Sequence, residues 1–471
     1  MNLNVNLVIF SAPKKYISRD IRMLTIPNFC DKELTDDLLE TYEIQNALYN
    51  ITEESISSII SLLSRCHSPN TINHLPLLFS QALLYRRHNA KLFSSLLLQI
   101  YENPSIRWIF FNIKTFIFSK KSFIEPILFP YEISRIHILR LCYDLGLIEL
   151  KEVIQFCQTL KSFKREYRFQ AIFIYFWFLQ EIYENDTQFA QSMFYFTLHK
   201  TKKHLLKHVF ELILNNLREI KENKWKKFHD LLNFGYFEES LAGFILKDNC
   251  DSLQALLSSS NINFNEILFP SFFYPFTVQY NQFNLSVFSA FCGSVKCFKF
   301  LYLNNMNNIP LNKYFELNEI EAAVCGGNAE ILHLCQQNHQ NSKALGLAAE
   351  FHYNEIFDWI HESTNEEISS KVLDMAVKSN NIYVLVNYFD LIPVWDFETV
   401  RQSLMLDSSA VFRFMVSSKK FNVFHTVNSF GWNIFQFMNI YKSEEEKIFV
   451  SKLAEKVAND SIDKINEITK S

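Results

Sequence analysis

Three histidines near the middle of the chain have part of the spacing that a metal site on a helix requires. His204 and His208 are four residues apart, so they share one face of a helix, and His199 precedes them. Zinc metalloproteases place a general-base glutamate between two such ligands, whereas two leucines and a lysine stand there in this chain. Neighbouring lysines would also repel a cation. We therefore expect a solvated basic surface here and no metal site.

Cysteines and glycines of the C-terminal half offer two further candidates for chemistry. Cys292 and Cys297 are five residues apart, and Cys325 and Cys335 are ten apart. Structural zinc sites use closer pairs of the C-x2-C type, so we expect buried thiols instead. The segment Gly326-Gly327-Asn328 lacks the frame of a phosphate-binding loop and a preceding strand, and we expect a turn there.

A basic stretch between residues 161 and 227 is a candidate binding face. Residues 200–227 contain nine lysines and arginines against three glutamates, and Trp225 and Phe228 stand among them. Such a stretch can bind RNA, an anionic membrane or an acidic partner. Solvated helix faces are also commonly charged, and we favour this second interpretation.

No serine–histidine–aspartate order, paired acids or nucleotide motif stands out in the sequence. We therefore expect no catalytic residue, no cofactor and no enzymatic activity. An enzyme whose catalytic groups converge from distant segments is the remaining alternative. The aromatic run from Phe169 to Phe178 predicts a central buried helix, with a partner-binding groove as the alternative.

The composition indicates a folded, helix-rich chain. Its 471 residues include 47 Phe and 20 Tyr but only 8 Gly and 11 Pro, which excludes a disordered chain. The net charge of -4 is unlike that of a polyanion-binding protein. Nine cysteines without framework spacing, and no signal peptide, predict an intracellular, cytoplasmic location. The longest apolar run, Ala171 to Leu179, is too short to span a bilayer.

The chain divides into three parts by pattern. Residues 1–34 read as an irregular leader, and residues 35–245 follow helical spacing with breaks at prolines. From residue 246 to 471 a recurring unit appears, in which small residues precede a turn and an apolar helix follows. Gly and Asn at the turn tolerate the left-handed conformation that ends a helix. The expected turn residues are Asn249, Gly293, Gly327, His352, Asn380 and Ser408, spaced by 44, 34, 25, 28 and 28 residues.

This unit resembles a degenerate ankyrin repeat, whose period is about 33 residues. The last unit, 422–437, resembles an ankyrin finger, with Gly431 at the finger glycine. The segment 433–436, Asn-Ile-Phe-Gln, stands where the family has Thr-Pro-Leu-His. The segments 268–301 and 326–331 are similar to the ankyrin-related family called domain of unknown function 3447, which is expanded in trichomonad-type protists. The resemblance implies a helical N-terminal half, a protein-binding solenoid and no catalytic residues.

We therefore predict an all-α fold, in which an irregular helical domain precedes an α-solenoid of degenerate ankyrin-like helix pairs. Short hairpins are expected near 261–287 and 421–435, and a polar cap over 444–468. Such a surface favours a non-enzymatic scaffold that binds a protein partner, with the basic face over 161–227 as the alternative binding site. The candidate contact residues are aromatic or imidazole side chains of the fingers, which otherwise belong to the core: Tyr280, Phe283, Phe424, His425, Phe430 and Trp432.

Overall fold

The computed structural model describes most of the chain between residues 24 and 455. The described residues are 24–119, 129–163, 167–200, 213–214, 216–259, 266–268, 271, 273–274, 277, 282–305, 317–335, 343–364, 367–392, 394–406, 409–418, 420–422, 427–429, 431–441, 447–452 and 455. Most of the expected leader (1–34) and most of the polar cap (444–468) therefore lie outside them.

Helices make up nearly all of the regular structure, which confirms the all-α prediction. The N-terminal half contains α1 (Lys32–Tyr49), α2 (Ile56–Ser64), α3 (Pro69–Tyr85), η2 (Arg87–Asn89), α4 (Ala90–Glu102), α5 (Arg107–Ile117), α6 (Phe129–Asp144), α7 (Leu150–Ser162), α8 (Arg168–Trp177), α9 (Leu179–Asn185), α10 (Thr187–Lys200) and α12 (Leu217–Phe234). None of the helices in the described residues has both the length and the apolarity needed to cross a bilayer.

Side-chain caps and prolines set several of these helix ends. The Asp31 carboxylate accepts from Leu34 N at the start of α1, and the Ser68 hydroxyl accepts from Thr71 N at the start of α3. Pro69 occupies the first turn of α3, where its missing N–H costs no helical hydrogen bond. The aromatic helix α8 is buried on every face from residue 170 to its end, so the predicted core helix is confirmed.

The C-terminal half consists of short helices that follow one another in pairs. Their bounds are α13 (Leu241–Leu246), α14 (Cys250–Ser259), α15 (Leu285–Phe291), α16 (Val295–Asn305), α17 (Glu319–Gly326), α18 (Ala329–Cys335), α19 (Ala344–Glu350), α20 (Asn354–Thr364), α21 (Ser370–Lys378), α22 (Ile382–Asn387), η6 (Phe389–Leu391), α23 (Phe397–Met405), α24 (Ser409–Ser417) and α25 (Ile434–Tyr441). A two-residue antiparallel ladder, β1 (Ile267–Leu268) with β2 (Phe283–Asn284), precedes α15, where the sequence predicts a hairpin.

The first helices of successive pairs pack side by side, in the order α13, α15, α17, α19, α21 and α23. The small residues Ala290, Ala323, Ala348 and Ala376 are fully buried at these contacts. A Cβ added to Gly326 would lie 2.3 Å from the Ala290 carbonyl oxygen, so only glycine permits this approach. Small side chains thus determine how closely the pairs stack.

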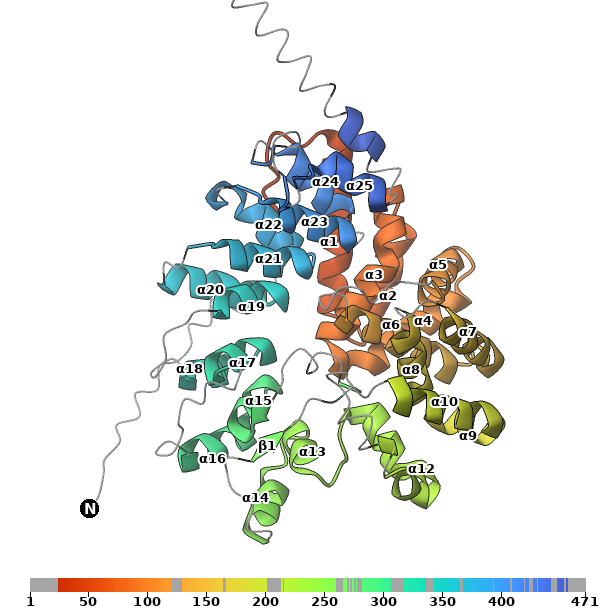
Figure 1. Cartoon of the computed structure of the whole chain (residues 1–471). Coiled ribbons are helices and arrows are strands. Elements are labelled where there is room, and N and C mark those ends of the chain that lie inside the picture. Colours follow the sequence, from red (N-terminus) through yellow and green to blue (C-terminus); the bar gives the residue numbers. More distant parts are fainter. Residues whose placement is uncertain are drawn as a thin grey trace, which may run out of the picture.

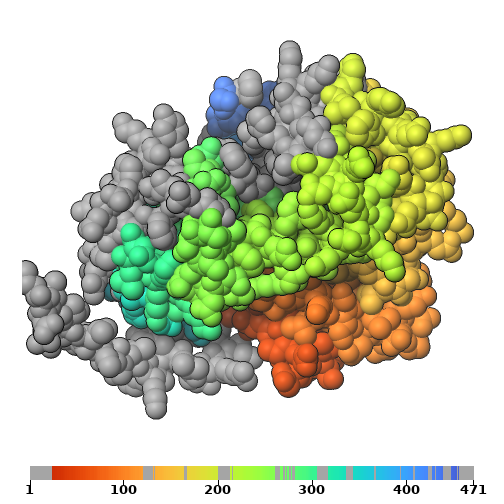
Figure 2. Space-filling view, turned by 90° about the horizontal axis from the view of Figure 1, so that it is seen from below, coloured from red at the N-terminus to blue at the C-terminus, as the bar shows by residue number. Residues whose placement is uncertain are grey.

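The two halves pack against each other and share one hydrophobic core. In Figure 1 the blue C-terminal helices rise beside the red helices α1 and α3, and α24 contacts both of them. Helix α22 also contacts α1. Seen from below, the yellow-green surface around α12 to α14 spans the region between the orange and teal helices (Figure 2). The chain therefore returns on itself, and its last helices close against its first.

Candidate functional site

Left-handed residues occur at most of the described positions that the sequence marks as turns. The φ angles are 69° at Gly293, 63° at Gly327, 57° at His352, 59° at Asn380 and 77° at Gly431. Ser408 lies outside the described residues. A positive φ is uncommon for histidine, so His352 must be held by its surroundings.

The first turn differs from the prediction by one residue. Asp248 has the left-handed φ of 50°, whereas the Asn249 side chain caps α14 by accepting from Ser252 N at 3.1 Å. The Asp248 carboxylate accepts from the backbone N–H groups of Lys296 (3.2 Å) and Cys297 (2.9 Å) in the next pair. The short aspartate side chain tolerates the left-handed conformation and also joins two helix pairs.

The turns at His352 and Asn380 face the N-terminal helices α1 and α3. Gln45 of α1 donates to the Asn380 carbonyl oxygen at 2.7 Å, and the Asn380 amide donates to His74 Nε2 of α3 at 3.0 Å. The His352 ring stacks on Tyr49 with centroids 4.0 Å apart, and its Nε2 donates to the Ser379 carbonyl oxygen at 2.9 Å. Burial lowers the pKa of His352 to about 3, so the ring is neutral.

Two further contacts join the N-terminal half to residues beside these turns. The Tyr131 hydroxyl of α6 donates to the Lys378 carbonyl oxygen at 2.6 Å. The Arg86 guanidinium lies over the Tyr353 ring, 4.1 Å from its centroid. We call the surface formed by the turns from Tyr353 to Asn380 the turn face. It is already covered by the chain's own N-terminal helices.

Only one described residue among the candidate finger contacts is at the surface. Trp432 is 40% exposed, and its backbone carbonyl accepts from Asn428 N at 2.9 Å. The predicted contact role of Phe283 is corrected, because its side chain is fully buried and packs against Phe288 and Phe291. The other four lie outside the described residues: Tyr280, Phe424, His425 and Phe430.

The last unit contains a cap although it lacks the family's Pro and His. The Asn433 side chain accepts from Gln436 N at 3.1 Å, and the Gln436 side chain accepts from Asn433 N at 2.9 Å. This reciprocal pair is a capping box at the start of α25. Asn433 and Gln436 thus satisfy two backbone N–H groups at the start of this helix.

The metal and thiol candidates form no cluster in the part of the chain that the structure describes. All nine cysteines are free thiols, and the described residues contain no group of three or more His, Cys, Asp or Glu able to hold a metal ion. Burial raises the pKa of Cys335 to about 12, and it also raises that of Cys292. His199 is exposed, and His204 and His208 lie outside the described residues.

Some lysines in the described part of the basic stretch form local contacts. Lys221 Nζ lies 3.7 Å from the Tyr183 ring centroid, and Lys227 forms an ion pair with Glu219. Trp225 and Phe228, which stand among these basic residues in the sequence, are buried and not free to stack on a ligand. Residues 201–212 lie outside the described residues.

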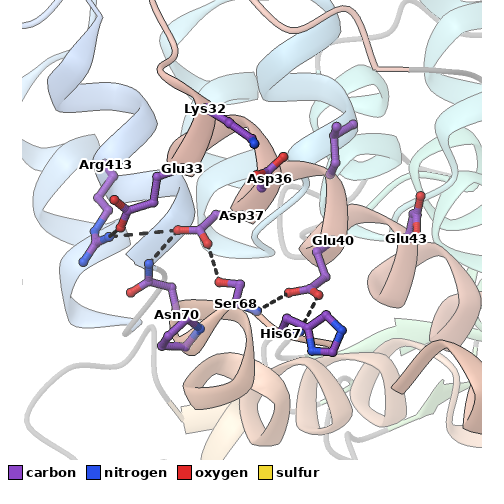
Figure 3. A pocket seen from close by; sticks show the side chains of 12 residues that line it. Lys32, Glu33, Asp36, Asp37, Glu40, Glu43, His67, Ser68, Asn70 and Arg413 are labelled. Atoms are coloured by element: carbon purple, nitrogen blue, oxygen red, sulfur yellow. Dashed lines mark hydrogen bonds and ion pairs between the residues drawn. The ribbon is translucent and has the colours of Figure 1, made fainter. Parts of the chain in front are cut away.

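A surface groove of about 960 Å³ lies between α1, the start of α3 and α24 (Figure 3). Five carboxylates line it against two cationic side chains, Lys32 and Arg413. The carboxylates recur every three or four residues along α1, which places them on one helix face. They belong to Glu33, Asp36, Asp37, Glu40 and Glu43.

Two of the carboxylates hold the start of α3. Glu40 accepts from the backbone N–H groups of His67 (2.8 Å) and Ser68 (3.0 Å), and Asp37 accepts from Asn70 Nδ2 at 2.6 Å. Burial raises the pKa of Asp37, although Ser68 and Asn70 both donate to it. These acids fix the wall of the groove, so its shape is set by hydrogen bonds.

The remaining carboxylates face the opening. At one end Arg413 lies 3.6 Å from Glu33 and 4.0 Å from Asp37. Asp36, near the middle of the acidic face, and Glu43, at the end away from Arg413, are exposed, and no described residue forms an ion pair or hydrogen bond with either carboxylate (Figure 3). The groove therefore holds one guanidinium of the chain itself and has acceptor capacity left for another cation.

Sequence reasoning missed this groove, although a signal was present. Five acids fall within the eleven residues 33–43 at helix-face spacing, and like charges four apart destabilise a helix. The comparisons with known proteins add no precedent. No family model matches the chain, and neither a curated protein nor a solved structure shows significant similarity to it.

Proposed function

We propose that this chain is a non-enzymatic scaffold that binds a protein partner, and that its C-terminal helix pairs form a degenerate ankyrin-like solenoid. The ordered packing of the first helices and the left-handed turns between the helices of a pair support this proposal. Nine thiols without a disulfide are consistent with the reducing interior of a cell.

The single observation that carries the proposal is the acidic groove. The turn face is occupied by α1 and α3, whereas the groove is open and strongly anionic. We propose that it takes a lysine- or arginine-rich segment of a partner. Arg413 supplies an internal example, since its guanidinium already sits against Glu33 and Asp37. A partner cation would bind Asp36 and Glu43 in the same way.

The size of the effect follows from the exposure of these carboxylates. An exposed ion pair contributes little, about 0.2–1 kcal/mol. Two such pairs correspond to a change in affinity of about two- to thirtyfold, which is measurable at low salt. Attraction between exposed charges also weakens with ionic strength, because the Debye length shortens to about 8 Å at physiological salt.

The test is fluorescence anisotropy with a short labelled lysine-rich peptide, using the full chain. The double variant Asp36→Asn/Glu43→Gln should weaken binding about two- to thirtyfold in dilute salt. The matched control Glu355→Gln/Glu362→Gln removes two exposed acids from α20 and should leave affinity unchanged. Equal losses in both variants, or no binding by the wild type, would refute the proposal. A parallel titration with single-stranded RNA tests the basic face over 161–227.

A further inference from the structure

A second hollow, separate from the acidic groove, lies where the end of α3 meets the turns of the C-terminal pairs. Its volume is about 270 Å³. Tyr85 and η2 form one side, and the turns around Gly293 and Gly327 form the other. His88 lines it and is exposed, so the cavity reaches the surface. Pockets for drug-sized ligands measure about 300–1,000 Å³, so this cavity suits a smaller molecule.

Arg87 on the cavity wall is a buried cation that no carboxylate in the described part of the chain neutralises. It is 8% exposed, and no carboxylate of the described residues lies within ion-pair distance of it. Its Nη2 donates to the Leu232 carbonyl oxygen at 2.9 Å, whereas its Nη1 has no hydrogen-bond partner among the described residues. Burial lowers the pKa of Arg87 to about 10, so the guanidinium stays charged at neutral pH. A buried charge left this way is costly unless a ligand completes it.

The rest of the lining is aromatic or neutral. The rings come from Tyr85, Tyr274, Phe291, Phe351 and Tyr353, and none of the described residues that line the cavity has an acidic side chain. Arg87 itself lies over the Tyr274 ring, 5.0 Å from the centroid. These surroundings favour a flat apolar group and a single negative charge.

A glycine keeps space beside the guanidinium. A Cβ added to Gly235 would lie 2.9 Å from Arg87 Nη1 and 2.8 Å from Tyr274 Cβ. The φ of 84° at Gly235 also disfavours any other residue. The position of Arg87 therefore depends on the absence of a side chain at this point.

We propose that this cavity binds a small aromatic carboxylate, whose charge pairs with Arg87 and whose ring packs against the tyrosine and phenylalanine side chains. One guanidinium matches one carboxylate. A phosphate dianion would need further donors, and the N–H groups of the lining turn residues Cys292, Gly293 and Gly327 already bond to backbone carbonyls. Aromatic walls select an aromatic ligand over a purely polar anion. This site is independent of the proposed partner groove.

The test compares benzoate, benzamide and inorganic phosphate by isothermal titration calorimetry on the full chain. Benzamide has nearly the shape of benzoate without its charge, so benzoate should bind at least about tenfold more tightly. Phosphate should bind more weakly than benzoate. This comparison needs no variant, so it stands even where a substitution at Arg87 prevents folding.

Two arginine variants then locate the site. Arg87→Met should lose benzoate binding. Arg107→Met is the matched control, because Arg107 also donates to a backbone carbonyl, that of Tyr101, and also lies over a tyrosine ring. The proposal is overturned if benzoate shows no saturable binding, if benzamide or phosphate binds as tightly, or if folded Arg87→Met binds benzoate like the wild type.

Discussion

Asn380 gives a quantitative test of how the turns hold the N-terminal helices. The residue is fully buried, has a left-handed φ of 59°, and hydrogen-bonds to α1 and α3 at once. Asn380→Gly keeps access to the left-handed conformation but removes the amide that donates to His74. Asn380→Ala also removes the amide, and it keeps a Cβ at the positive φ without the polar side chain that lets asparagine tolerate this conformation.

The two substitutions separate the hydrogen bond to His74 from the cost of the left-handed backbone conformation. Loss of a buried hydrogen bond costs about 1–2 kcal/mol, because His74 Nε2 loses its donor. The left-handed conformation adds about 1–2 kcal/mol for alanine but not for glycine. We therefore expect Asn380→Gly to destabilise by about 1–2 kcal/mol and Asn380→Ala by about 2–4 kcal/mol.

The assay is urea unfolding followed by circular dichroism, with midpoints in the order wild type, Asn380→Gly, Asn380→Ala. The control is Gly431→Ala, since φ there is 77° and nothing lies within 4 Å of an added Cβ. It should show the conformational cost alone, about 1–2 kcal/mol. If Asn380→Gly leaves the urea midpoint unchanged, or lowers it as much as Asn380→Ala does, the contacts described for this turn are wrong.

Four further predictions use other features of the structure. Protonation of the unfolded chain at His352 should reduce stability by up to about 1.4 kcal/mol per pH unit as the pH falls from about 6.5 toward 3, and His352→Gln should flatten this dependence in acid titrations. Trp395→Ala should cost about 3–5 kcal/mol in urea unfolding because the side chain is 1% exposed, whereas Trp432→Ala should cost much less. Gly326→Ala should lower the thermal midpoint, since the new Cβ meets backbone that cannot move aside. Cys142, buried and with its pKa raised to about 12, should resist alkylation until the chain unfolds, as mass spectrometry would show.

Local chemistry made much of the fold predictable. Helix-period spacing and proline breaks indicate most of the helices, and the helix–turn–helix pattern marks Gly293, Gly327, His352 and Asn380 as left-handed turns. These features depend on a few neighbouring residues. At the first turn, Asp and Asn both tolerate the left-handed conformation, and the sequence alone does not separate Asp248 from Asn249.

Long-range packing was not predictable in the same way. Gln45 and Asn380 are 335 residues apart, and only their spatial contact explains why a buried helix face carries a glutamine. The sequence does not decide whether Phe283 is a contact or a core residue, because an aromatic side chain in a short strand can point to either side. In the structure it faces Phe288 and Phe291 and belongs to the core. The spacing of the five acids predicts the acidic face of α1, but no local pattern predicts that α24 packs beside it.

The claim that the groove selects basic partner segments is tested most directly by reversing its charge. Asp36→Lys/Glu43→Lys replaces two exposed carboxylates with ammonium groups at the open end of the groove. In anisotropy titrations the variant should no longer bind the lysine-rich peptide and should bind a glutamate-rich peptide instead. A folded variant that still binds the lysine-rich peptide like the wild type would contradict the account.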